Sequence, residues 1–416
     1  AFNNLFRSLQ NQGGMNDDDH PAMRKLRQRF TTFNEQNPDN QTGLTYELQL
    51  SIWLGEDDLV EGLFQKLTTA SPDNRDLGMA WADYFIKKSD YTRSDRAYAR
   101  LLETYPDDPE IRIQYAQKLK QRNLYARVIE LLGRFEFDYA EWPEAAAILS
   151  DSLLAEHRIA EAVETLESIP DASELPADIA KQRIKTDADS TLPLMKEYIA
   201  HWEAEQAIRT LEGSENDLPL AQIITPKGII KIELFENQAP NTVANFILLA
   251  DAKFYHGSTF HRVLPNFMSQ GGDPNSKSGA TGNLGDGNPG YFIPDEFGRE
   301  DARKHFSGSL SMAKQQDIPN TGGCQFFITH TPTTWLNDQH TVFGRVIEGL
   351  NVARNLEEGD RIEAVMILRK RDHDYVPEKL SLQSVATPLP IGSTLENQSI
   401  QLQPNSTPPT TTQPGG

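Results

Sequence analysis

The sequence predicts a multidomain protein in which an all-α helical-repeat solenoid precedes a mainly-β closed barrel with flanking helices. The chain has 416 residues, which is too long for one ordinary hydrophobic core. From about residue 44 to residue 211, apolar residues recur at helical spacing with almost no strand-like alternation. From residue 219 onward, short strand patterns alternate with glycine-containing turns. These observations divide the chain into two folded parts of different class.

The expected domain boundaries follow the changes in composition. We expect separate helices at 177–186 and 192–210, after which Gly213 and its neighbours interrupt the helical pattern. The end of the chain is expected to be flexible, because 381–416 hold six prolines and one charged residue and cannot bury enough apolar surface to offset chain entropy. The expected segments are a polar N-terminal part with one short helix at 22–33 (1–41), a helical-repeat domain (42–212), a linker (213–218), a barrel domain (219–371) and a Pro/Ser/Thr/Gln-rich flexible tail (372–416).

A repeat of about 34 residues runs through the helical half. Trp81, Tyr115 and Leu149 are each 34 positions apart, and each lies early in the first helix of an expected helix pair. This pattern resembles tetratricopeptide repeats, whose paired helices stack into a curved solenoid. An unrelated helical bundle is the alternative, because Phe85 and Leu119 stand where these repeats usually have glycine, and the spacing drifts in the third repeat.

Composition excludes several classes of function. The formal net charge is −20, so no nucleic-acid partner is expected, because nothing basic would offset phosphate repulsion. A single cysteine, Cys324, excludes an intramolecular disulfide and a CxxC type of metal site, and we expect neither a metal nor a cofactor. No apolar run approaches the roughly 18 residues that a membrane span needs.

The first residues bear on the expected location. The chain begins Ala1-Phe2-Asn3, without an initiator methionine. We expect a protein of the bacterial periplasm or envelope whose leader or anchor has been removed. A cytoplasmic protein with a trimmed start is the alternative.

The first of three motifs in the β half is the segment 260–274. It combines the cation Arg262, the aromatic Phe267 and, close by, Met268 and Gln270, and a Gly-Gly turn follows. If the segment runs as one extended strand as far as Gln270, then Arg262, Met268 and Gln270 point to one side, because side chains alternate along a strand. Phe267 would then need a local bend to join them.

The second and third motifs lie further along the chain. In 323–329, Gln325 and Phe327 share a face by the same period of two. The third motif, 335–344, reads WLNDQHTVFG. In this order and spacing, the three motifs resemble the cyclophilin family of peptidyl-prolyl cis–trans isomerases, over a little more than a third of the chain.

The resemblance implies a role for each matching residue. Arg262 matches the catalytic arginine of the family, and Trp335 matches the tryptophan associated with cyclosporin binding, which makes cyclosporin an expected ligand. Lys314 departs from the family, because many eukaryotic members have asparagine there, and it bears on that affinity. The matching substrate-binding residues are the pocket walls Phe267, Met268, Phe327 and Leu336, the rim residue His340, the amides Gln270 and Gln325, and Ala313 on the strip along which the peptide runs.

The physical chemistry of proline isomerisation agrees with these roles. The X-Pro bond rotates slowly because amide resonance imposes a barrier of roughly 18–20 kcal/mol. No covalent bond breaks, so neither a nucleophile nor a metal is required. A guanidinium that hydrogen-bonds the prolyl nitrogen stabilises the twisted state, in which that nitrogen gains a lone pair, more than either planar state.

We therefore expect an active peptidyl-prolyl cis–trans isomerase that serves as a protein-folding factor. Its expected substrates are Pro-containing peptides and unfolded client proteins, and its helical repeats are expected to bind a protein partner. The alternative is a non-catalytic scaffold or chaperone, in which the pocket only captures Pro-containing segments.

Overall fold

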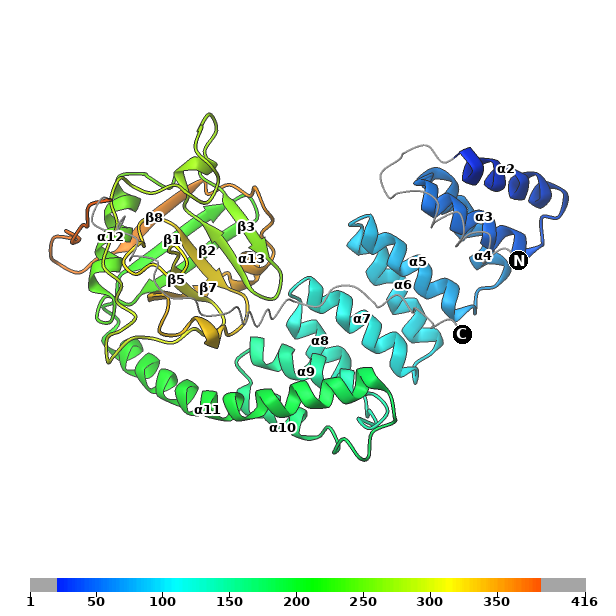
Figure 1. Cartoon of the computed structure of the whole chain (residues 1–416), viewed down its shortest axis with the longest axis horizontal. Helices are drawn as coiled ribbons and strands as arrows, with labels where there is room; N and C mark the ends of the chain where they lie inside the picture. The colour runs from blue at the N-terminus through cyan, green and yellow to red at the C-terminus, as the bar shows by residue number, and fades with distance from the viewer. Residues whose placement is uncertain (1–20, 383–416) are drawn as a thin grey trace, which may run out of the picture.

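The computed structural model describes residues 21–382. The expected flexible tail therefore lies, from residue 383 onward, outside the described residues, as do residues 1–20. A curved series of helices leads into a β-barrel, and a long helix runs from the end of that series to the barrel (Figure 1). The predicted fold class, a helical domain followed by a mainly-β domain, is confirmed. Within the described part of the chain, no helix is both long and apolar enough to cross a membrane.

The helical part consists of helices that pack against their neighbours in sequence. The helix expected at 22–33 is present and extends further at both ends. The helices are α2 (Pro21–Gln36), α3 (Gln41–Leu54), α4 (Asp57–Ala70), α5 (Arg75–Lys87), α6 (Tyr91–Thr104), α7 (Pro109–Gln121), α8 (Tyr125–Leu132), α9 (Pro143–Ala155), α10 (Ile159–Glu167) and α11 (Ile179–Glu215).

Four helix pairs, α3/α4 to α9/α10, begin at intervals of 34 residues. The residues that precede their first helices are Asn40, Asn74, Asp108 and Trp142. In the first three pairs, this side chain accepts a backbone N–H from the residue three positions later, which satisfies a donor that the helix leaves unpaired. The fourth pair has Pro143 at the first helical position, where no donor is lost.

The turn inside each pair repeats at the same interval. Gly55, Ser89, Asn123 and His157 are each 34 positions apart, and their φ angles lie between 55° and 70°. This left-handed conformation ends one helix and lets the chain reverse into the next. The 34-residue period therefore holds through the fourth pair, and the drift expected in the third repeat is wrong.

Helix α11 differs from the sequence prediction. Two helices were predicted, but one helix of 37 residues continues through Pro193 and includes Gly213 and Ser214. The predicted linker 213–218 is accordingly shorter, and the helix ends before Asn216, whose φ is 47°. An interior glycine costs a helix only about 1 kcal/mol. Contacts of the last turns with the barrel, described below, stabilise the helix against that cost.

The barrel is one antiparallel sheet of eight strands around an apolar core. Its hydrogen-bonded order is β3-β4-β6-β5-β7-β2-β1-β8, and the segments that precede the two edge strands are joined by a bridge between Thr259 and Arg361. Two helices, α12 (Pro240–Asp251) and α13 (Leu350–Arg354), flank it. The strands are β1 (Leu220–Thr225), β2 (Gly228–Leu234), β3 (Phe260–Leu264), β4 (Met268–Gly271), β5 (Ser309–Met312), β6 (Phe326–Thr329), β7 (Val342–Glu348) and β8 (Ala364–Arg369).

The first residues of the expected tail, 372–382, differ from the sequence prediction. A flexible segment was expected from residue 372, but the chain as far as Leu382 is described and contacts the barrel. The Tyr375 hydroxyl donates to the Glu236 carboxylate at 3.0 Å. Leu380 and Phe292 exchange two backbone hydrogen bonds, of 2.8 and 3.0 Å. These contacts attach the segment to the barrel, and the amino-acid composition alone does not reveal them.

The helical domain packs directly on the barrel. Tyr198 on α11 and Ile159 on α10 form an apolar cluster with Phe306 of the barrel. The Tyr198 hydroxyl also donates to the backbone carbonyl of His305 at 2.7 Å. The last turns of α11 add a buried ion cluster, in which Glu205 pairs with Arg303 of the barrel at 2.7 Å. The two domains therefore share a packed and polar interface.

Candidate active site

The candidate site is built on three neighbouring strands. The segment expected to be one strand is instead a hairpin, in which β3 and β4 are joined by a turn at residues 265–267. Arg262 lies opposite Gln270 across this hairpin, and Gln270 lies opposite Phe327 on β6. Residues that face each other across antiparallel strands point to the same side of a sheet. Strand pairing therefore aligns a cation, an amide and an aromatic ring in one row.

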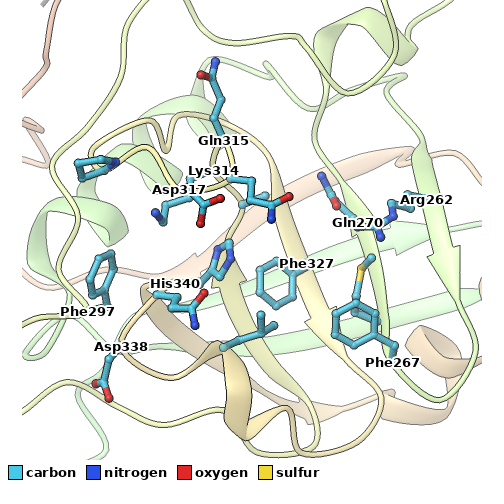
Figure 2. Close-up of a pocket in the computed structure, with 16 residues that line it drawn as sticks. Arg262, Phe267, Gln270, Phe297, Lys314, Gln315, Asp317, Phe327, Asp338 and His340 are labelled. Atoms are coloured by element: carbon cyan, nitrogen blue, oxygen red, sulfur yellow. The ribbon is translucent and has the colours of Figure 1, made fainter. Parts of the chain in front are cut away.

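This row forms one side of a cavity of about 690 Å³ (Figure 2). In Figure 2, Arg262 and Gln270 lie at one end of the cavity, His340 lies toward the other, and the Phe327 ring lies between them. The structure thus brings together most of the residues that the sequence singled out. Those that line the cavity are Arg262, Phe267, Met268, Gln270, Ala313, Phe327, Leu336 and His340.

Gln325 and Trp335 lie at the edges of this cavity. Gln325 lines an adjoining cavity of about 370 Å³, and its Oε1 accepts a hydrogen bond from Gln270 Nε2 at 3.1 Å. Its own amide nitrogen donates to the carbonyls of Gly285 and Gly287, at 2.7 and 2.9 Å, so the amide orientation is fixed. Trp335 is 59% exposed, and its ring centroid lies 5.8 Å from that of Phe267.

The guanidinium of Arg262 differs from those of the buried arginines of the barrel. The residue is exposed, and within 21–382 no carboxylate lies within ion-pair distance of its guanidinium. By contrast, Arg303 and Arg345 of the same barrel are paired with buried glutamates. A guanidinium without a fixed partner keeps its N–H donors available for a ligand in the cavity.

The floor of the cavity is apolar, and a buried histidine lies beside it. Met268 and Phe327 are buried, and the Phe327 ring meets the His340 ring edge-on at a centroid distance of 5.4 Å. His340 Nδ1 donates to the Met312 carbonyl at 3.0 Å. Burial lowers the pKa of His340 below its ordinary value of 6.5, with a smaller contribution in the same direction from Lys314. The cavity therefore offers an apolar floor, with Arg262 at one end and Lys314 among the other residues that line it.

Several residues that line the cavity were not identified from the sequence. Phe297 is one, and its ring lies 5.5 Å from the ammonium of Lys314, which the sequence had marked only as a departure from the family. Phe297 is remote in sequence from all three motifs, so no local spacing could identify it. The others belong to loops beside Lys314 and Leu336, namely Gln315, Gln316, Asp317, Pro319, Asp338 and Gln339.

The one cysteine of the chain, Cys324, is not suited to covalent catalysis. Cys324 lies in the adjoining cavity, but it is 1% exposed and burial raises the pKa of its thiol. A thiol is a poor nucleophile until it loses its proton. The arrangement instead suits a reaction in which an apolar ring is held while a polar group beside it changes its geometry.

Two histidines buried beside the site make the stability of the protein depend on pH. Burial lowers the pKa of His305 to about 4 and that of His330 to about 3, whereas the ordinary value is 6.5. The unfolded state therefore binds more protons than the folded state as the pH falls below 6.5, and stability falls with it.

We expect the free energy of unfolding to drop by about 2 kcal/mol per histidine between pH 7 and pH 5. Urea unfolding at both pH values measures this change, and the variant His330→Gln should lose its share. An equal pH dependence in the parent and the variant would contradict the assignment.

Comparison with known proteins identifies the family. The sequence model described as "Cyclophilin type peptidyl-prolyl cis-trans isomerase/CLD" matches residues 220–372. A peptidyl-prolyl cis-trans isomerase of Synechococcus elongatus is 49% identical over 146 residues, which are 35% of this chain and 92% of that protein. Peptidyl-prolyl cis-trans isomerase B of Bacillus subtilis is 46% identical over 138 residues, or 33% of this chain and 90% of that protein. A crystal structure of a cyclophilin type isomerase of Cryptosporidium parvum aligns with a TM-score of 0.33 and 32% identity, over 37% of this chain and 99% of that chain.

The matched segments thus cover 92% and 90% of two bacterial isomerases, at 49% and 46% identity. It belongs to the family of cyclophilin-type peptidyl-prolyl cis–trans isomerases. The family resemblance predicted from the three motifs is confirmed. The helical domain lies outside the matched range of 220–372.

Proposed function

We propose that the chain isomerises X-Pro bonds in peptides and in unfolded client proteins, and that the cavity lined by Arg262 is the active site. The observation that carries this proposal is the Arg262 guanidinium, which has no ion-pair partner among residues 21–382 and is aligned by strand pairing with Gln270 and Phe327 beside an apolar floor. An apolar cavity fits a proline ring, and a cation beside it fits the lone pair that the prolyl nitrogen gains when the amide twists.

Most residues of the site would hold the substrate on one side of the X-Pro bond. Phe267, Met268, Phe327 and Leu336 would hold the proline ring by apolar contact, with His340 at the rim. Gln270 and Gln325, whose amides are already joined by a hydrogen bond, would bind the backbone next to the proline. The ring and its neighbours then stay fixed while the other side of the peptide rotates. Ala313 lies along the path that the bound peptide would take.

We further infer that the helical domain consists of tetratricopeptide-like repeats and binds a protein partner. The period of 34 residues, kept by four helix starts and four turns, is the length of that repeat. Such a module beside an isomerase would bring client chains to the active site, as a chaperone does. Cyclosporin is a proposed ligand, because the exposed Trp335 lies beside Phe267.

The test is NMR exchange spectroscopy on an Ala-Pro peptide with the full chain added in catalytic amount. We expect cross-peaks between the cis and trans signals at mixing times at which the peptide alone shows none, because uncatalysed exchange takes tens to hundreds of seconds. The variant Phe327→Ala removes the floor of the cavity and should weaken peptide binding. If peptide signals shift on binding without any acceleration, the pocket is a docking site for Pro-containing segments and the proposal fails.

A further inference from the structure

The turn that joins β3 to β4 contacts the helical domain one residue before the proline pocket. Asn266 in this turn has a φ of 60°, a left-handed conformation that asparagine tolerates better than most residues. Its backbone N–H donates to Asn123 Oδ1 at 2.7 Å, and its side-chain oxygen lies 3.0 Å from the Tyr125 hydroxyl. Phe267, which lines the pocket, is the next residue. The contact therefore acts on backbone that is directly attached to the pocket.

A second series of hydrogen bonds leads from the helical domain to Phe267. The Phe267 carbonyl accepts the backbone N–H of His330 at 2.8 Å. The carbonyl of His330 in turn accepts Arg354 Nε at 3.1 Å. The remaining nitrogens of Arg354 donate to the Glu156 carboxylate and to the Ala155 carbonyl, both in the helical domain, at 2.5 and 2.8 Å. Both routes end on the backbone at Asn266 and Phe267.

The side chains that make these contacts are enclosed. Asn123 is 7% exposed, Tyr125 is 1% exposed and Arg354 is 8% exposed. Asn123 Nδ2 donates to the Arg354 carbonyl at 2.7 Å, and the Arg354 guanidinium lies 4.7 Å from the centroid of the Tyr125 ring. Hydrogen bonds shielded from water are stronger than exposed ones, and a satisfied network of them is rigid. The contact is therefore suited to fixing the turn in one position.

The repeats do not themselves require an asparagine at this place. The equivalent position in the two preceding helix pairs is held by Gly55 and by the exposed Ser89, with the same sign of φ. The backbone conformation of the turn is thus compatible with other residues. What Asn123 adds is a side chain that donates to Arg354 and accepts from Asn266. The identity of this residue serves the contact with the barrel.

We propose that Asn123 and Tyr125 of the helical domain are positioning residues for isomerisation, which act by fixing Phe267 in the proline pocket. The proposal rests on the proposed function of that pocket. A shift of the pocket wall moves the bound proline relative to the Arg262 guanidinium, and a misplacement of about 1 Å can cost up to about 100-fold in rate. The helical domain thereby contributes to the reaction itself, in addition to binding any partner.

The test uses two variants of the full chain, each with a matched control. Asn123→Gly removes the acceptor for Asn266 and keeps the left-handed turn, and its control Ser89→Gly makes the same change at the equivalent place one repeat earlier. Tyr125→Phe removes one buried hydroxyl, and its control Tyr98→Phe removes another, which bonds Asp83 at 3.0 Å within the helical domain. For each protein we measure kcat/KM on an Ala-Pro peptide at 25 °C, the thermal midpoint, and the NMR signal of the Trp335 indole N–H.

We expect both interface variants to lower kcat/KM about tenfold and to shift the Trp335 signal, because that ring lies 5.8 Å from the Phe267 ring. Both controls should match the parent in rate and signal. A purely structural role would lower the thermal midpoint and leave rate and signal unchanged, and that result overturns the proposal. An equal loss of rate in the controls also overturns it. If the parent itself is inactive, the proposed function fails, and the Trp335 signal still decides whether Asn123 positions the pocket.

Discussion

Replacing Arg262 with alanine is expected to lower kcat/KM for an Ala-Pro peptide by about 10²–10³-fold, the usual effect of removing one donor that stabilises a transition state. The guanidinium is directed at the cavity by strand β3 and has no ion-pair partner within residues 21–382. Its bond to the prolyl nitrogen forms fully only when the amide is twisted, so kcat should fall while the peptide affinity changes little. NMR line-shape analysis over a peptide titration separates the two quantities.

Arg262→Lys is the matched control for charge. Lysine keeps the positive charge but lacks the planar guanidinium with its fixed donors, so we expect a rate between those of the parent and the alanine variant. Because Arg262 is exposed, neither substitution should change the free energy of unfolding by more than about 0.5 kcal/mol, the usual effect of a surface substitution. A parent-like kcat/KM for Arg262→Ala would exclude this residue from catalysis and redirect attention to Lys314, the other lysine or arginine that lines the same cavity among the described residues.

The site could be predicted from the sequence because its residues are close together along the chain. Arg262, Phe267 and Gln270 lie on one hairpin, and Gln325 and Phe327 lie on or beside one strand, so short motifs carry most of the geometry. Side-chain alternation alone does not reveal the hairpin, because it treats 260–270 as one strand. Pro265 and Asn266 mark the turn in retrospect, since both residue types are common in turns.

The helical period was predicted from packing residues, whereas the structure shows it more clearly in capping residues. Asn40, Asn74 and Asp108 accept hydrogen bonds at the helix starts, and their spacing is already present in the sequence. N-cap residues are chosen by local backbone geometry, so they mark where a helix starts more sharply than packing residues do. In the fourth pair Trp142 makes no such cap, and there the packing residue Leu149 keeps the spacing.

The domain interface could not be predicted, because its partners are far apart in sequence. Glu205 and Arg303 look like ordinary surface charges in their own segments, yet they pair across 98 positions. The same interface explains why α11 continues past its expected end, since Glu212 near the last turn is held by Arg303 and Arg345. Local breakers such as Gly213 therefore gave the wrong helix end, because a tertiary contact outweighed a weak local preference.

The buried ion cluster at this interface contains equal numbers of acids and bases. Arg303 is 2% exposed as a side chain, Glu205 5% and Glu212 4%, and Arg303 pairs with the two glutamates at 2.7 and 2.6 Å. Burial alone would raise the pKa of Glu205, but hydrogen bonds and charge from Arg303 outweigh it and the pKa is lowered. The cluster consists of Glu205, Glu212 and Glu233 with Arg209, Arg303 and Arg345.

Replacing Arg303 with alanine is therefore expected to lower the free energy of unfolding by about 3–5 kcal/mol, because it removes the arginine that two buried carboxylates share and leaves the cluster with more acids than bases. Arg299→Ala is the matched control in the same loop, since the Arg299–Asp301 pair is 43% and 49% exposed and such pairs contribute about 0–1 kcal/mol. Urea unfolding followed by circular dichroism measures both changes.

The cause of the Arg303→Ala effect can be separated from a simple loss of packing. In the double variant Arg303→Met, Glu212→Gln, one buried carboxylate is removed together with the arginine, and the pairs Glu205–Arg209 and Glu233–Arg345 remain. Most of the stability should then return, because the penalty comes from unpaired charge. If the double variant is as unstable as Arg303→Ala, packing and not charge dominates the interface. If Arg303→Ala matches Arg299→Ala, the cluster does not hold the domains together, and the other contacts, such as Tyr198 with Phe306 and Arg354 with Glu156, must account for their association.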